Sequence, residues 1–69
     1  MIDKEVYDYA MMAIPKGKEI IMQNRERYKG EVKFPFCCNG FNELIFDMDK
    51  EEFVRIEFFK DGKKIVYGI

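Results

Sequence analysis

The sequence contains no Ser, Thr, His or Trp. Without Ser, Thr and His, it lacks the hydroxyl nucleophiles and the imidazole base on which most acyl-transfer and hydrolytic sites depend. It also lacks the commonest zinc ligand and the hydroxyl that a Walker-type phosphate loop places on magnesium. Any chemistry would have to come from Cys, Asp, Glu, Lys, Arg or Tyr. We therefore predict a protein that is not an enzyme and holds no cofactor or metal.

Long apolar runs are missing as well. No stretch approaches the ~20 apolar residues that are needed to span a bilayer, and charged residues make up 36% of the chain. Asp3, Lys4 and Glu5 interrupt the N-terminus before the apolar core of a signal peptide can form. These features predict a soluble protein with no membrane association, and the cytoplasm is its expected location.

The length of 69 residues predicts one compact domain, residues 1–69. A chain of this size buries only about 60% of the surface that its unfolded form exposes, so its core is marginal. The apolar fraction of 48%, with seven Phe and four Tyr, is generous for such a chain. Small domains often gain further stability from disulfides, metals or self-association.

The first segment has the apolar spacing of a helix. Apolar residues at steps of three and four form one stripe: Ile2, Val6, Tyr9, Ala10 and Ala13. Asp3 is the expected N-cap, and Pro15 and Gly17 are expected to end or sharply bend this helix. Residues 18–29 fit a second helix that stops at Gly30, with a strand over 19–23 as the alternative.

From Glu31 onward the apolar period changes to two, which is typical of a strand with one apolar face. Pro35 cannot donate a ladder hydrogen bond, so this strand is expected at an edge of the sheet. A three-residue turn over 38–40 with a G1 bulge is predicted, because a one-residue slip would move every side chain to the other face. This register groups the following apolar residues on one face: Phe34, Phe36, Leu44, Phe46 and Met48.

The C-terminal residues predict a β-hairpin with a two-residue type I′ turn at Asp61-Gly62. This turn pairs six apolar residues on one face: Phe58 with Ile65, Ile56 with Tyr67, and Val54 with Ile69. Residues 49–51 are expected to connect the second and third strands. The predicted fold is α+β: residues 1–30 are mainly helical, and residues 31–69 form a four-stranded antiparallel β-meander with the helical segments packed on one face.

The same alternation assigns apolar residues to the opposite face of the sheet, which is normally polar. Three interpretations stay open: residues 18–29 fold over this face, it is a partner or homodimer surface, or the assigned register is in error. The candidate partner-binding residues are Phe41, Ile45, Phe53, Arg55, Phe59 and Val66.

Charge is segregated along the chain, although the net charge is only −1. Residues 15–34 carry six basic and three acidic side chains, and residues 35–57 carry two basic and six acidic ones. A basic patch is the candidate surface for phosphate contacts: Lys16, Lys18, Arg25, Arg27, Lys29 and Lys33. Interleaved acidic residues favour an ordinary solvated helix face instead.

Two further groups of residues match no known site. Cys37 and Cys38 lack the spacing of a redox Cys-X-X-Cys motif, and no second pair completes a zinc site. The acidic residues 47–52 fail the EF-hand pattern, because Glu52 stands where Gly is required and Phe58 where a bidentate Glu belongs. Reduced thiols and a solvated acidic loop are the simpler interpretations.

These observations favour a small non-catalytic protein–protein interaction module. The hypothesis is an inhibitor or regulator of bacterial or phage origin, a source suggested by the Lys- and Ile-rich usage, acting by occupying a partner's surface or by dimerising. The alternative is a small nucleic-acid-binding regulator that uses the basic residues of segment 16–33. A protein partner or self-association is thus expected, and nucleic acid is less favoured.

Overall fold

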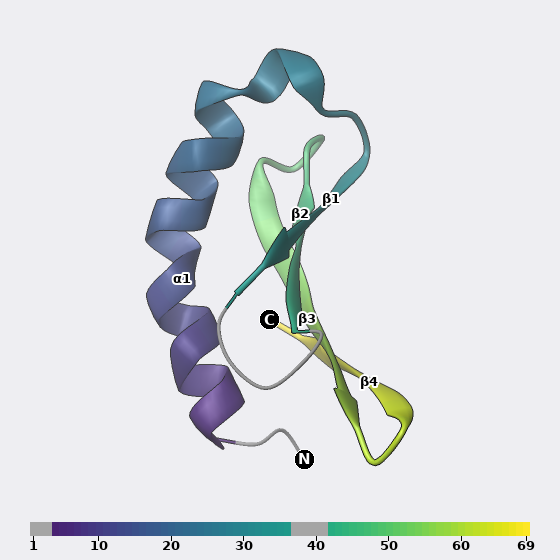
Figure 1. The fold of residues 1–69 in the computed structure, drawn as a ribbon. Coiled ribbons are helices and arrows are strands. Elements are labelled where there is room, and N and C mark those ends of the chain that lie inside the picture. The colour runs from purple at the N-terminus through teal and green to yellow at the C-terminus, as the bar shows by residue number, and fades with distance from the viewer. Residues whose placement is uncertain (1–3, 37–41) are drawn as a thin grey trace.

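The computed structural model describes residues 4–36 and 42–69. Helix α1 (Lys4–Gln23) and the short 3-10 helix η1 (Arg25–Arg27) precede a four-stranded antiparallel sheet. The strands are β1 (Glu31–Pro35), β2 (Glu43–Asp47), β3 (Glu52–Lys60) and β4 (Lys63–Gly68), in the spatial order β1-β2-β3-β4. Helix α1 runs along one face of this meander (Figure 1), so the predicted α+β architecture is confirmed.

Helix α1 continues through Pro15, so the prediction that the helix could end there is wrong. A proline inside a helix removes one backbone hydrogen bond and crowds the preceding turn. Pro15 lies on the exposed side of α1, where water can satisfy the carbonyl that loses its partner. The opposite side of the helix is held by its packing on the sheet, and this packing outweighs the local preference.

Gly17 does not stop the helix either, and its backbone lies close against two aromatic rings of the sheet. A Cβ atom at this position would lie 2.9 Å from Cζ of Phe53 and 3.0 Å from Cε2 of Phe34. Such distances are too short for a carbon contact. The missing side chain therefore lets two aromatic rings pack against the helix backbone.

The end of α1 excludes the alternative strand over 19–23, since these residues are helical. The Asn24 side chain donates a hydrogen bond to the Ile20 carbonyl at 2.8 Å, and the Asn24 amide donates to the Ile21 carbonyl. After η1 the chain turns at Gly30, which has a φ of +68°. This left-handed conformation favours glycine, and it directs the chain into β1.

The first strand pair has the predicted register. Phe34 lies opposite Leu44 and Val32 opposite Phe46, which is the pairing that a three-residue turn would give. Pro35 is the last residue of β1, an edge strand as predicted. The turn and bulge predicted for 38–40, and the predicted N-cap Asp3, lie outside the described residues.

The C-terminal hairpin also forms as predicted. Phe58 lies opposite Ile65 and Ile56 opposite Tyr67, and the Ile69 amide donates to the Val54 carbonyl at 3.1 Å. Asp61 and Gly62 both have positive φ, at 53° and 76°. Positive φ at both central residues defines a type I′ turn.

A β-bulge in β3 changes the predicted face of Phe53. Ile45 lies opposite Arg55, but the next residue, Phe46, lies opposite Phe53, so Val54 is an extra residue in the ladder. An extra residue shifts the alternation of side chains by one position. Phe53 therefore points to the helix side, and its predicted place on the opposite face is wrong.

The core lies between α1 and the sheet. Phe53 packs edge-to-face against Phe46, with ring centroids 5.0 Å apart, and against Phe34 at 6.1 Å. Tyr7 of α1 makes a similar contact with Tyr67 of β4 at 5.9 Å. The core cluster consists of Ala10, Ile21, Leu44, Phe46, Phe53, Ile56 and Phe58. Five large aromatic or aliphatic side chains from the sheet thus bury the apolar stripe of the helix.

Candidate functional site

The sheet face opposite α1, called the outer face below, carries the residues of greatest functional interest. Ile21, near the end of α1, belongs to the core on the helix side, and η1 contains no buried residue. Residues 18–29 therefore do not provide the cover that one interpretation of the sequence required.

Arg55 crosses the outer face from β3 to β1. Its guanidinium donates two hydrogen bonds to the Glu31 carboxylate, from Nη1 and Nη2, both at 2.7 Å. Strand β2 lies between these two strands, and its residue Ile45 lies directly opposite Arg55. Ile45 is only 1% exposed although it lies on the face opposite α1. The apolar stem of an arginine can shield such a side chain while its charged end stays in contact with water.

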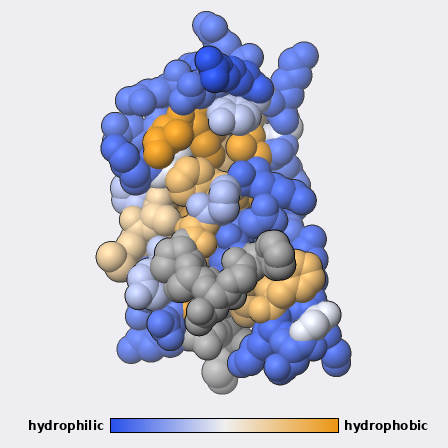
Figure 2. Space-filling model, in the orientation of Figure 1, coloured by the Kyte–Doolittle hydropathy of each residue, from blue (hydrophilic) through white to orange (hydrophobic). Residues whose placement is uncertain are grey.

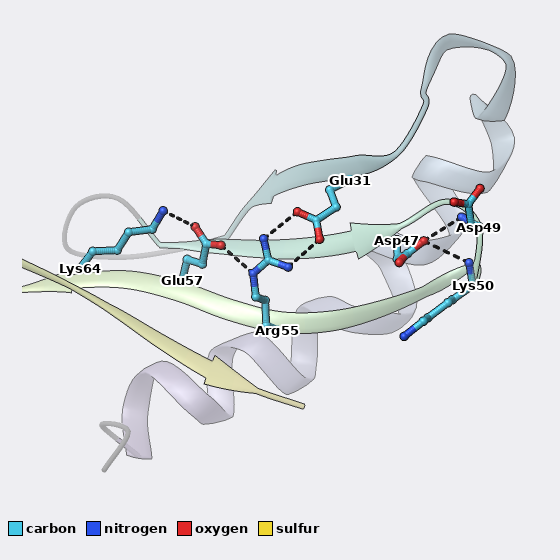
Figure 3. Close-up of polar contacts among 7 residues, drawn as sticks. All are labelled: Glu31, Asp47, Asp49, Lys50, Arg55, Glu57 and Lys64. Atoms are coloured by element: carbon cyan, nitrogen blue, oxygen red, sulfur yellow. Dashed lines mark hydrogen bonds and ion pairs between the residues drawn. The ribbon is translucent and has the colours of Figure 1, made fainter.

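A continuous chain of ion pairs extends from this contact toward β4 (Figure 3). Arg55 Nε donates to Glu57 Oε2 at 2.7 Å, and Lys64 Nζ lies 2.7 Å from Glu57 Oε1. Glu57 is only 6% exposed, so both of its oxygens are engaged at a buried position. We call the residues Glu31, Arg55, Glu57 and Lys64 the charged chain.

Contacts within the charged chain shift the pKa values of Glu31, Arg55 and Glu57. The hydrogen bond from Lys64, followed by that from Arg55, lowers the pKa of Glu57 below its ordinary value. The hydrogen bond from Arg55 likewise lowers the pKa of Glu31, and Glu31 and Glu57 raise the pKa of Arg55. These shifts favour the charged forms of Glu31, Arg55 and Glu57.

Apolar residues of the β3–β4 hairpin remain exposed beside the charged chain. Val66 is 56% exposed and Phe59 is 50% exposed. Val66 lies opposite Glu57, and Phe59 lies opposite Lys64, so the two apolar residues are diagonal neighbours on the outer face. We call Phe59, Lys64 and Val66 the hairpin surface. Figure 2 shows that, on the face in view, apolar patches are framed by hydrophilic residues.

Strand β4 forms an open edge of the sheet, since β3 is its one neighbouring strand among the described residues. The bond from Ile69 to Val54 fixes which residues exchange hydrogen bonds with β3. Hydrogen-bonded and non-hydrogen-bonded pairs alternate along an antiparallel ladder. The backbone groups of Ile65 and Tyr67, four and two residues before Ile69, therefore bond to β3. The backbone groups of Lys64, Val66 and Gly68 point to the open side. Unpaired groups of this kind can accept another strand.

No family model matches this chain, and no curated protein and no solved structure shows significant similarity to it. None of the described helices is long and apolar enough to cross a membrane. The geometry of the surface is therefore the basis for inferring a function.

The six predicted partner-binding residues do not all lie on the outer face. Arg55, Phe59 and Val66 lie on the outer face as predicted, with Arg55 engaged in the charged chain. Ile45 also lies on this face but is covered, and Phe53 is in the core. Phe41 lies outside the described residues. Sequence reasoning missed the pairing of Arg55 with Glu31, because the two residues belong to strands that are not neighbours.

The six predicted basic residues are all exposed but do not share one face. Lys16 and Lys18 flank the buried Gly17 on α1, and residues two apart on a helix point about 200° away from each other. Two of the six face carboxylates: Lys16 lies 3.9 Å from Glu19, and Arg25 lies 3.8 Å from Glu51. The patch is therefore dispersed over α1, η1, the segment between η1 and β1, and β1: Lys16, Lys18, Arg25, Arg27, Lys29 and Lys33.

The acidic loop after β2 has a local role in shaping its turn. Asp47 Oδ1 accepts hydrogen bonds from the amides of Asp49 and Lys50, at 2.9 Å and 3.2 Å (Figure 3). Such a contact stabilises a tight turn. Within the described ranges, no three His, Cys, Asp or Glu residues come together as a metal site. Cys37 and Cys38 lie outside those ranges.

Proposed function

We propose that this chain is a non-catalytic protein–protein interaction module that acts through the hairpin surface and the open edge of β4. In this proposal it is an inhibitor or regulator of bacterial or phage origin that works in the cytoplasm. Such a protein needs no reactive side chain, in keeping with a sequence that lacks Ser, Thr and His.

The exposure of Val66 on an open edge strand is the observation that carries this proposal. Ile45, an apolar residue of the same face that lies opposite Arg55, is only 1% exposed. Val66 is 56% exposed. An open strand with an exposed apolar side chain offers both backbone hydrogen bonds and apolar contact to a partner strand.

The proposal can be tested by affinity capture from a lysate of the organism that encodes the chain. We expect the wild-type chain to capture a stoichiometric protein, and the Val66→Ser variant to lose it. Met12→Ser is the matched control, because Met12 is 75% exposed on α1, away from the sheet edge. It should capture the same protein as the wild type.

Two outcomes would contradict the proposal. One is equal capture by the wild type and by Val66→Ser, which would place the contact elsewhere. The other is a capture that disappears after nuclease treatment, which would favour the nucleic-acid alternative.

A further inference from the structure

We infer that the partner of β4 is a second copy of this chain, whose own β4 adds to the open edge in antiparallel orientation. The two-fold axis passes beside Val66, so the two four-stranded sheets become one continuous sheet. This inference rests on the proposed interaction function and names its partner. It follows from the hydrogen-bonding direction, charge and apolar pattern of β4.

The hydrogen-bonding direction selects the pairs. A two-fold axis at Val66 places Val66 opposite Val66 of the second copy, and Lys64 opposite Gly68 of the second copy. These are the residues of β4 whose backbone groups point away from β3, as the pairing of Ile69 with Val54 requires. Each of these pairs can exchange two backbone hydrogen bonds. The register therefore uses every outward-pointing residue of the strand.

The charges of β4 favour the same register. With the axis at Val66, the lysines of one copy lie opposite uncharged residues of the other: Lys64 opposite Gly68, and Lys63 opposite Ile69. An axis at Lys64 would place two lysines directly opposite each other, which destabilises a strand pair. An axis at Ile65 would place Gly68 opposite Gly62 in the hairpin turn, where the ladder ends.

The apolar pattern continues across the proposed contact. On the helix side of the sheet, Ile65 would lie opposite Tyr67 of the second copy. Within one chain, Ile65 lies opposite Phe58 and Tyr67 opposite Ile56. The row Phe58, Ile65, Tyr67 and Ile56 would thus cross both copies without a charged residue. Tyr67 is 37% exposed, and its burial would add to the small core of each copy.

Sedimentation equilibrium of the full chain over a wide concentration range tests this inference. We expect a reversible monomer–dimer equilibrium for the wild type. Val66→Lys should weaken it at least tenfold, because two lysines would face each other at the axis. Val66 is exposed on the outer face, so circular dichroism should show an unchanged fold. Met12→Lys adds the same charge at an exposed site on α1 and should leave the dimer unchanged.

A second experiment tests the register in which the two β4 strands pair. In a mixture of isotope-labelled and unlabelled chains, a filtered NOE experiment reports contacts between copies. The Val66 register predicts an intermolecular contact between the Ile65 methyl groups and the Tyr67 ring. A dimer that shows no such contact, or that Val66→Lys leaves intact, would overturn the inference.

A wild-type chain that stays monomeric at every concentration would also overturn it. The capture experiment with Val66→Ser then separates the two proposals. If the monomer captures another protein through Val66, the inference fails and the proposed function stands. If it captures nothing, both fail.

Discussion

Gly17 of α1 lies directly against the ring of Phe53 on β3, so that a Cβ atom at position 17 would stand 2.9 Å from Phe53 Cζ. This contact sets how closely the helix approaches the sheet. It also fixes the face to which Phe53 belongs, since a ring that touches the helix cannot lie on the outer face. The glycine and the β-bulge at Val54 are thus two parts of one packing arrangement.

Replacing Gly17 with alanine should destabilise the fold, although alanine is the better helix former by about 1 kcal/mol. The added methyl group would meet the rings of Phe53 and Phe34, and overpacking of this kind typically costs about 1–3 kcal/mol. Urea denaturation measures the difference. Gly68→Ala is the control, because a Cβ at Gly68 meets no atom within 4 Å. A Gly17→Ala variant more stable than the wild type would refute the close contact.

Replacement by serine should destabilise the fold strongly at Phe53 and only slightly at Phe59. Phe53 is 7% exposed in the core, and truncation of a core phenylalanine costs about 3–5 kcal/mol. This is a large part of the roughly 5–15 kcal/mol that stabilises a small domain, so Phe53→Ser should unfold readily. Phe59 is half exposed, and Phe59→Ser should keep the fold. Thermal melts followed by circular dichroism compare the two, and a folded Phe53→Ser variant would contradict the bulged register.

Replacing Gly62 in the turn at Asp61-Gly62 should destabilise the fold. Gly62 has a φ of +76°, and no atom lies within 4 Å of the place that a Cβ would take. The expected effect of Gly62→Ala is therefore backbone strain rather than a clash. The left-handed conformation costs a non-glycine residue about 1–2 kcal/mol. Asp61→Asn should be almost neutral, because Asn tolerates positive φ well. Equal stability of the Gly62→Ala variant and the wild type would argue against the type I′ turn.

The charged chain predicts a loss of stability in acid. The pKa values of Glu31 and Glu57 are lowered in the folded state, so the unfolded chain binds protons more readily than the folded chain. Their contribution is therefore present above the ordinary carboxylate pKa and is lost as the pH falls through the lowered folded values. The melting temperature should fall over this acidic range. The melting temperature of Glu57→Gln should depend less steeply on pH than that of the wild type. Equal slopes for the two proteins would contradict the role assigned to Glu57.

The sequence carries enough information for the antiparallel meander and for an N-terminal helix, but not for the length of that helix or for the bulge. The alternation in β1 and β2 and the Asp61-Gly62 turn predict the register correctly, because a slip would expose a whole row of apolar side chains. Phe53 and Val54 are both apolar and adjacent, so either one can fill the core position. The pattern therefore cannot show which residue the bulge displaces.

Pro15 and Gly17 illustrate a different limit. Both residues disfavour a helix locally, and the prediction followed that preference. The structure shows that Pro15 is on the exposed side and that Gly17 lies close against Phe53 and Phe34 of the sheet. Both features depend on residues far away in the sequence. The charged chain likewise depends on a contact between β1 and β3, which pattern analysis of single strands does not reveal.

Amide hydrogen exchange at Val66 tests most directly whether the open edge of β4 is the contact surface. In a dilute solution of the chain, we expect the Val66 amide to exchange faster than that of Ile65, which bonds to β3. Raising the protein concentration, or adding a captured partner, should slow the exchange of Val66 and Gly68. An exchange rate at Val66 that stays constant while amides elsewhere become protected would contradict the account.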